Sequence, residues 1–272
     1  MKNTVKNERV TYYSDLLNDD FAGTNINTCH VPADFKYVRT GAVWQITSFI
    51  VYYIVAVPVV WVMAKLVLGL KFENRRVLKK LRGTCFFLYG NHTNNLDVYI
   101  PALAAFPKRS YIIANPDIVS IRGIKHLVMM LGALPVPSER KGMRGFTEAI
   151  SLRCKERSCI AVYPEAHIWP YYTGIRPFTD TSFYYPVYNG APAVAMVTTY
   201  RKRKGLFALC KRPGMTVTFS EIFFPDLSLS KREAQKELHG QVYEFMKTRS
   251  ENTDQVCYIR YEYKEKHEKP GA

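Results

Sequence analysis

From residue 84 onward, short apolar runs alternate with stretches of helical periodicity. The apolar runs have the length and the β-branched or aromatic content of buried strands, and they cover residues 84–90, 110–115, 133–137, 159–164 and 192–200. Helical stretches near 121–131 and 143–156 lie between several of these runs. Strands that alternate with helices predict an α/β fold in which a mostly parallel central sheet is flanked by helices.

Two further elements follow towards the C-terminus. Residues 215–224 have the alternation of another strand. Residues 230–249 predict an amphipathic helix, with Leu238, Val242 and Phe245 along one face.

A long uncharged run precedes this alternating region. Residues 43–64, "VWQITSFIVYYIVAVPVVWVMA", are enough to cross a hydrocarbon layer of about 30 Å as a helix. The run starts too far into the chain to be a cleaved secretory signal. Pro58 would either kink a membrane-anchoring helix or split the run into a helical hairpin. The alternative is a buried helix of a soluble core.

These patterns divide the chain into three parts. Residues 1–42 form a polar N-terminal segment, residues 43–70 a membrane-anchoring helical segment, and residues 71–272 the domain that carries the candidate chemistry.

The distribution of charge predicts on which side of the membrane the rest of the chain lies. The formal net charge of +15 favours an anionic partner, which could be nucleic acid, a phosphorylated substrate or acidic lipid. A basic cluster directly follows the apolar run and comprises Lys71, Arg75, Arg76, Lys79, Lys80 and Arg82. Because positive flanks stay on the cytoplasmic side of a membrane, the catalytic part is expected to face the cytoplasm.

The stretch "GNHTNNLDVYIP" at residues 90–101 places polar groups directly after a predicted strand. His92 and Asp97 would point about 140° apart on a continuous helix, so they can meet only through a turn. Asn91 and the other loop formers allow that turn. The carboxylate could then fix the imidazole tautomer and leave the other ring nitrogen free to take a proton. The alternative is that His92 caps a helix whose dipole Asp97 complements.

Four sequence blocks, taken in their order along the chain, favour the first of these two alternatives. "NHTNNLD" resembles the asparagine, histidine, four residues, aspartate motif of the glycerolipid acyltransferases, among them the 1-acylglycerol-3-phosphate acyltransferases. "GALPVPSERKGMRGFTEAI" (132–150) and "VYPEAHIWPYYTGIRPF" (162–178) are similar to the family's second and third blocks. "APAVAMVTTY" resembles its apolar fourth block. The resemblance covers roughly residues 70–225.

The resemblance implies a membrane-associated acyltransferase in phospholipid biosynthesis. His92 would take the proton of an acceptor hydroxyl as it attacks an acyl thioester, with Asp97 orienting the base. Backbone amides near Asn91 would stabilise the oxyanion. The acceptor would be a lysophospholipid such as 1-acylglycerol-3-phosphate, and the co-substrate acyl-CoA or acyl-ACP, the acyl carrier protein thioester. Residues 71–272 would be the acyltransferase domain, working at an anionic membrane surface without cofactor, metal or nucleic acid.

The third block departs from the family pattern. Glu165 is retained after a proline, but Ile168 stands where the family carries the arginine that helps to hold the acceptor phosphate. Arg176 and Arg140, with Lys141 and Arg144, are the predicted replacements, because guanidinium groups pair well with phosphate. Asn91 and Glu165 complete the predicted substrate-binding set. The alternative for each basic residue is a solvated surface charge.

Three other functions remain open. The acceptor could be a different, non-phosphorylated membrane alcohol. A metal-dependent hydrolase could use His92, Asp97, Glu165 and His167 as ligands. A non-enzymatic module could bind anionic lipid or nucleic acid through clusters such as "YRKRKG" at 200–205.

Overall fold

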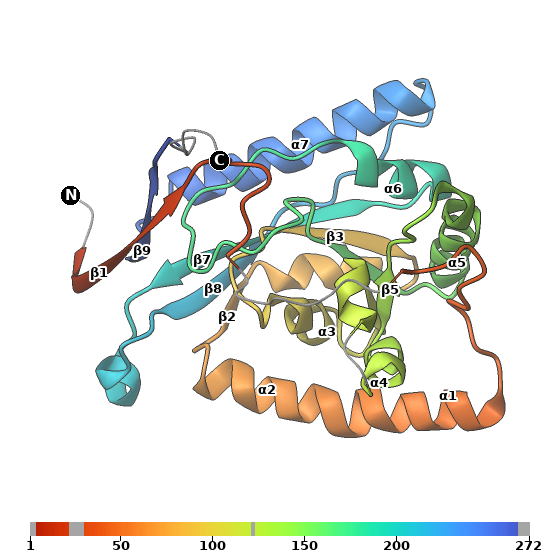
Figure 1. The fold of residues 1–272 in the computed structure, drawn as a ribbon, viewed down its shortest axis with the longest axis horizontal. Helices are drawn as coiled ribbons and strands as arrows, with labels where there is room; N and C mark the ends of the chain where they lie inside the picture. Colours follow the sequence, from red (N-terminus) through yellow and green to blue (C-terminus); the bar gives the residue numbers. More distant parts are fainter. Residues whose placement is uncertain (1–3, 22–29, 121–122, 266–272) are drawn as a thin grey trace, which may run out of the picture.

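A seven-stranded sheet forms the centre of the protein (Figure 1). The computed structural model describes residues 4–21, 30–120 and 123–265. The strand order is β2-β8-β7-β3-β6-β4-β5, and every neighbouring pair is parallel except β7 and β8. The strands are β2 (Lys71–Glu73), β3 (Phe86–Gly90), β4 (Ser110–Ala114), β5 (Ala133–Pro135), β6 (Cys159–Val162), β7 (Ala193–Arg201) and β8 (Gly214–Phe219). The predicted mostly parallel α/β sheet is confirmed.

Strand β3 shows why these runs are apolar without interruption. Phe87 and Tyr89 pack into the core on one face of the sheet, while Phe86 and Leu88 pack into the core on the other. Since successive side chains of a strand point to opposite faces, a sheet covered on both sides needs apolar residues at every position.

Helices cover both faces. The first face carries α5 (Met143–Lys155), α6 (Tyr184–Asn189) and α7 (Lys231–Glu251); the second carries η2 (Arg75–Leu81), α3 (Ile100–Ala105) and part of the apolar helix. Leu238 and Val242 of α7 are buried and Phe245 packs beside them, as the sequence predicts. The remaining helices are η3 (Asp97–Tyr99), η4 (Pro116–Val119), α4 (Lys125–Met130), η5 (Arg140–Gly142), η6 (Thr181–Phe183) and η7 (Gly205–Leu209). The start of the helix predicted near 121–131 lies outside the described residues.

The apolar run forms one continuous helix. It comprises α1 (Ala42–Phe49), a π-helical stretch η1 (Ile50–Ala56) and α2 (Val57–Leu66), 25 residues in all. Pro58 stands in the first turn after the π-helical stretch, whose wider turn accommodates a residue without an N–H. The alternative of a helical hairpin is therefore wrong.

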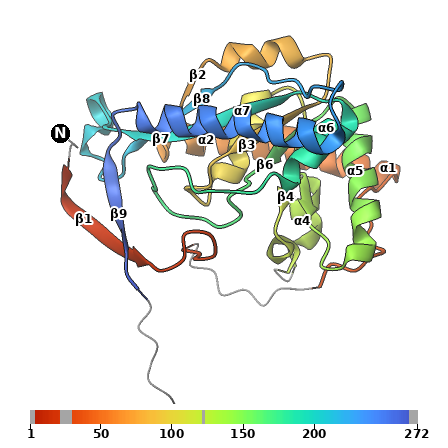
Figure 2. The same ribbon diagram turned by 90° about the horizontal axis from the view of Figure 1, so that it is seen from above.

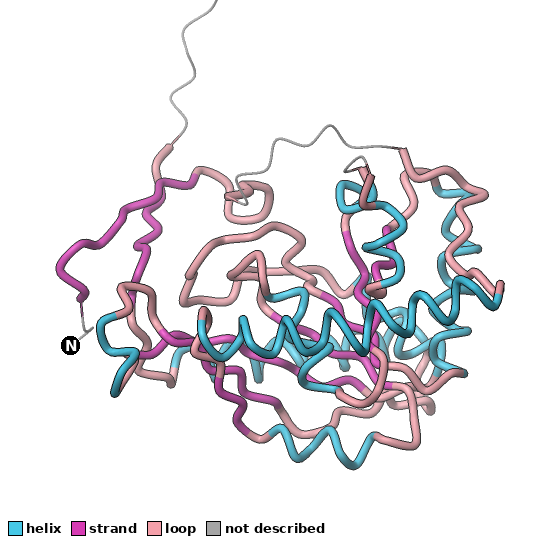
Figure 3. Tube along the Cα trace, turned by 90° about the horizontal axis from the view of Figure 1, so that it is seen from below, coloured by secondary structure: helices cyan, strands magenta, loops and turns pink. Residues whose placement is uncertain are grey.

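This helix lies along the domain and leaves most of its surface open. Seen from below, it runs across the underside of the molecule (Figure 3). Hydrogen bonds hold it at Ser48 Oγ, which donates to Met130 O (3.2 Å), and at Tyr52 Oη, which accepts from Ser110 N (2.9 Å). Only 11% of its apolar window is buried. The alternative of a soluble-core helix is wrong, because a core helix would be enclosed.

The N-terminal segment joins the C-terminus in a second sheet. Strand β1 (Thr4–Tyr13) pairs in parallel with β9 (Cys257–Tyr263), and both stand apart from the central sheet (Figure 2). The following residues pack on the third sequence block, where Trp169 Nε1 donates to Asp19 O (2.7 Å) and Phe21 N to Ile168 O (3.0 Å).

Candidate active site

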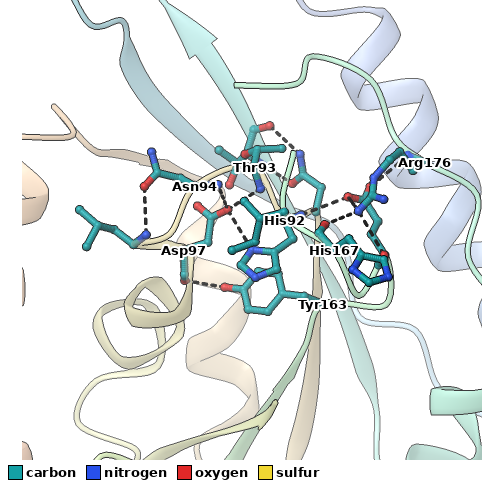
Figure 4. Close-up of polar contacts among 12 residues, drawn as sticks. His92, Thr93, Asn94, Asp97, Tyr163, His167 and Arg176 are labelled. Atoms are coloured by element: carbon teal, nitrogen blue, oxygen red, sulfur yellow. Dashed lines mark hydrogen bonds and ion pairs between the residues drawn. The ribbon is translucent and has the colours of Figure 1, made fainter. Parts of the chain in front are cut away.

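The chain after β3 turns sharply around a carboxylate. Asp97 Oδ2 accepts hydrogen bonds from Thr93 N and Asn94 N, both at 2.7 Å, and lies 3.6 Å from His92 Nδ1 (Figure 4). Asn94 O accepts from Asp97 N at 2.9 Å and closes the turn. The structure thus brings His92 and Asp97 together through the predicted turn. Base-to-carboxylate distances are often long in free enzymes and shorten when substrate binds.

A tyrosine that the sequence did not indicate orients the histidine. The ring of Tyr163 stacks on His92 with centroids 4.7 Å apart, and its hydroxyl donates to Asp97 O at 2.5 Å. Burial raises the pKa of Tyr163 well above its usual value, so this hydroxyl remains a donor. Within the described chain no hydrogen bond engages His92 Nε2. The position of Tyr163, directly after buried strand β6 beside β3, is the signal that could have found it.

Gly90 permits this stacking. A Cβ atom there would lie 2.8 Å from Met196 Cε and 2.9 Å from Tyr163 Cε1. Any larger residue would therefore displace the ring that packs on His92.

Asn91 ties the turn to the neighbouring strand. Its Oδ1 accepts from Thr198 N (2.8 Å) and its Nδ2 donates to Thr198 O (3.0 Å). Both ends of the amide are engaged with β7, and the side chain is buried. The structure gives Asn91 a positioning role in place of the predicted substrate contact.

Glu165 and Arg176 form a buried pair behind the histidine. Glu165 accepts from His92 N (3.3 Å) and Arg176 N (3.1 Å), and the two side chains approach to 3.6 Å. Arg176 is 1% exposed, and its Nη2 also donates to the carbonyls of Glu165 and His167. Burial raises the pKa of Glu165, and Arg176 opposes that rise. The structure therefore shows this pair bonded to the turn behind His92; the phosphate and substrate contacts predicted for the two residues stay a prediction.

Arg140 is exposed on η5, after edge strand β5. In the sheet, β5 is separated from β3 by β6 and β4, a distance of about 14 Å at the usual strand spacing. Lys141 and Arg144 are exposed on the same segment, and Arg144 pairs with Glu148 at 2.9 Å. Among the described residues, no hydrogen bond or ion pair joins these three cations to His92, Asp97 or Glu165.

The four residues considered as metal ligands face different partners. His167 Nδ1 lies 3.6 Å from Asp20 Oδ2, while Glu165 pairs with Arg176. Among the described residues, no group of three His, Cys, Asp or Glu side chains is arranged to hold a metal ion.

The backbone amides of the turn are already occupied. The amides of residues 92–94 donate to the carboxylates of Glu165 and Asp97, and those of residues 96 and 97 donate to oxygens of Asn94. The prediction that the turn amides stabilise an oxyanion is wrong for these five.

An apolar pocket lies beside the turn. Val98 and Tyr99, which directly follow Asp97, line it together with the apolar helix, α3, β4 and the segment leading to β5. Most of the lining is aliphatic, including Ala56, Val57, Val60, Ile112 and Leu131. Apolar linings of this kind are typical of sites that bind hydrocarbon.

Comparisons with known proteins identify the fold and the family. The crystal structure of the 1-acyl-sn-glycerophosphate (LPA) acyltransferase PlsC from Thermotoga maritima is similar, with a TM-score of 0.51 and 15% identity. The alignment covers 78% of this chain and 89% of that chain, so the two share a fold. No curated protein sequence matches the chain. The model of the Acyltransferase family matches residues 70–215, more than half of the chain and all four sequence blocks up to β8. The chain therefore belongs to the Acyltransferase family and is an acyltransferase.

Proposed function

We propose that this enzyme moves a fatty acyl group from a thioester to the hydroxyl of a lysophospholipid such as 1-acylglycerol-3-phosphate, in phospholipid biosynthesis at a membrane surface. The observation that carries the proposal is the His92 imidazole, held between Asp97 and Tyr163 with Nε2 unengaged. The fold shared with PlsC supports this acceptor class.

The geometry supports general base catalysis. His92 Nε2 takes the hydroxyl proton as the oxygen attacks the thioester carbonyl, and Asp97 stabilises the imidazolium that forms. When the tetrahedral intermediate collapses, the carbon–sulfur bond breaks and the imidazolium returns its proton to the departing thiolate. The products are an ester and a free thiol, either coenzyme A or acyl carrier protein. Proton removal of this kind contributes about 10²–10⁴ to the rate.

The apolar pocket supports a fatty acyl donor. Its aliphatic lining removes hydrocarbon from water, which stabilises binding by about 0.8 kcal/mol for each buried methylene. Val98 and Tyr99, which line the pocket, directly follow Asp97 in the sequence.

The apolar helix supports attachment by lying in one leaflet. It is bonded to the domain near both its first turns and its middle, at Ser48 and Tyr52, and Ala64 packs in the core near its end. A helix held along its length against a folded domain cannot cross the bilayer while that domain stays in water. Its outward face is apolar at Ile46, Phe49, Ile54, Val59, Trp61 and Leu66. This is the arrangement of an interfacial helix. The net charge of +15 favours the anionic cytoplasmic leaflet.

A non-phosphorylated membrane alcohol is a second candidate acceptor. Arg176 is buried with Glu165 and donates to the carbonyls of Glu165 and His167, so it is not open to an acceptor phosphate. An alcohol without phosphate would need no such contact.

One assay distinguishes these acceptors. The purified enzyme in neutral detergent micelles is given labelled acyl-CoA or acyl-ACP and a panel of lysophospholipids, monoacylglycerol and long-chain alcohols, and the lipids formed are identified by mass spectrometry. We expect acylated 1-acylglycerol-3-phosphate. Acylation of the neutral alcohols alone would select the second candidate, and no product with either donor would contradict both.

A further inference from the structure

A strongly basic pocket lies at the edge of the sheet opposite to His92. It is formed where β3, β4 and β6 begin, whereas His92 follows the end of β3. Four of its cations are exposed and make no side-chain bond within the described part of the chain: Arg76, Lys79, Arg82 and Arg157. Its one acidic lining residue, Glu156, is paired with Arg153 at 2.8 Å. The positive charge is therefore uncompensated.

Three half-buried cations frame the same pocket. Arg75 donates to the carbonyls of Leu103 and Ala104 at 2.7 and 2.8 Å. Lys108 donates to three backbone carbonyls, and Arg109 to Ser48 Oγ at 2.7 Å. Since carbonyl and hydroxyl oxygens carry no net charge, these bonds fix the cations in place without neutralising them. The result is a preorganised positive field of the kind that binds phosphate.

The pocket opens beside the apolar helix. Tyr53 of the helix and Phe106 form part of its wall, with ring centroids 6.5 Å apart, and Phe106 is 50% exposed. Tyr53 Oη donates to Pro107 O at 3.1 Å and joins the helix to this wall. A soluble anion would need only the cations. An aromatic rim continuous with a membrane-facing helix fits a molecule with an anionic head and apolar tails.

We propose that this pocket binds the headgroup of an anionic phospholipid, separate from the catalytic centre. The proposal rests on the proposed attachment of the helix to a membrane. The positive-inside rule applies to the flanks of helices that cross the membrane, and an interfacial helix does not cross it. The basic cluster after the helix therefore serves to hold acidic lipid at the leaflet where the enzyme works.

The test reverses the charge of three of the four exposed cations and leaves the framing ones. The variant Arg76→Glu, Lys79→Glu, Arg82→Glu changes three side chains without bonds among the described residues. The control Arg232→Glu, Lys236→Glu, Lys247→Glu makes the same charge change on α7, which lies across the molecule from the apolar helix (Figure 1). Binding is measured by sedimentation with vesicles of phosphatidylcholine alone or with phosphatidylglycerol in equal parts.

We expect the pocket variant to bind the phosphatidylglycerol vesicles about a hundredfold more weakly than wild type, at about 1 kcal/mol for each basic residue near an anionic surface. The control should bind within a fewfold of wild type, and binding to phosphatidylcholine should be the same for all three. Equal binding of pocket variant and wild type would overturn the proposal.

Two further measurements test whether the pocket binds the phosphate of a soluble molecule or that of a lipid headgroup. Inorganic phosphate and coenzyme A are titrated into the wild type and the pocket variant by calorimetry. If either binds the wild type through these residues while vesicle binding is unchanged in the variant, the pocket takes a soluble anion and the lipid proposal fails. Acyl transfer in neutral detergent micelles should be equal in both proteins. A protein that transfers no acyl group yet loses vesicle binding in the variant would contradict the proposed function alone.

Discussion

The two edges of the central sheet use polar residues in opposite ways. At the carboxyl ends of the strands, Asn91, Asp97 and Glu165 are buried: Asn91 and Glu165 bond to the backbone of another segment, and Asp97 bonds to the backbone of its own turn. At the amino ends, Arg76, Lys79 and Arg82 are exposed and make no such bonds among the described residues. Proton transfer requires atoms held within a few tenths of an ångström, whereas attraction to a charged surface requires only charge. Substitutions at the first edge should therefore change rate or stability, and those at the second should change lipid binding.

His92→Ala should show the largest difference between the effects of the two edges on acyl transfer and on lipid binding. Acyl transfer should fall about 10²–10⁴-fold, because the variant lacks the base that takes the hydroxyl proton. Binding to phosphatidylglycerol vesicles should be unchanged. His30→Ala, on an exposed histidine paired with Glu139, is the matched control and should keep full turnover. Full turnover in His92→Ala would disprove the mechanism.

Arg176→Met tests whether the buried pair behind the turn is structural. The free energy of unfolding should fall by about 3–5 kcal/mol, since Glu165 would keep a buried charge without its partner. Burial raises the pKa of Glu165 and Arg176 lowers it, so the substitution should raise that pKa further. The destabilisation should be largest above the new pKa and shrink as the pH falls through it and Glu165 becomes neutral. Urea denaturation over a range of pH measures this, and a loss independent of pH would argue against the pair.

Asp97→Asn keeps the size of the side chain but removes the negative charge that faces two backbone amides and the imidazole of His92. Stability should fall by about 2–3 kcal/mol, because hydrogen bonds to a charged acceptor are worth more than neutral ones. Turnover should fall with little change in KM for the acceptor, because Asp97 acts on the imidazolium that forms during reaction. A variant with weakened KM and normal kcat would instead place Asp97 in acceptor binding.

Tyr163→Phe is expected to have the smallest effect. It keeps the ring that stacks on His92 and removes the hydroxyl bond to Asp97 O, a loss of about 1 kcal/mol. Turnover should fall by up to about tenfold, while Tyr163→Ala, which also removes the stacking ring, should lose more. Equal activities of the two variants would show that the stacking does not orient His92.

Much of the fold could be predicted from the sequence, because strands and turns depend on residues that are close together along the chain. The strands were found because a sheet covered on both faces needs unbroken apolar runs, as in β3. The meeting of His92 and Asp97 followed from helix geometry and from the loop formers between them. The partners of Glu165 did not follow, because Arg176 and the His92 amide reach it only through the tertiary packing of two distant blocks.

The sequence by itself determined the α/β class, the His92 and Asp97 pair, the resemblance to glycerolipid acyltransferases and the presence of an apolar helix. The tertiary structure alone decided that this helix is continuous and lies along the domain, that Tyr163 stacks on the histidine, and that Asn91 and Arg176 hold the fold. It also gathered cations from three separate segments into one pocket. The reason is physical: periodicity and turn chemistry act over a few residues, whereas burial and the pairing of charges depend on which segments come together in space.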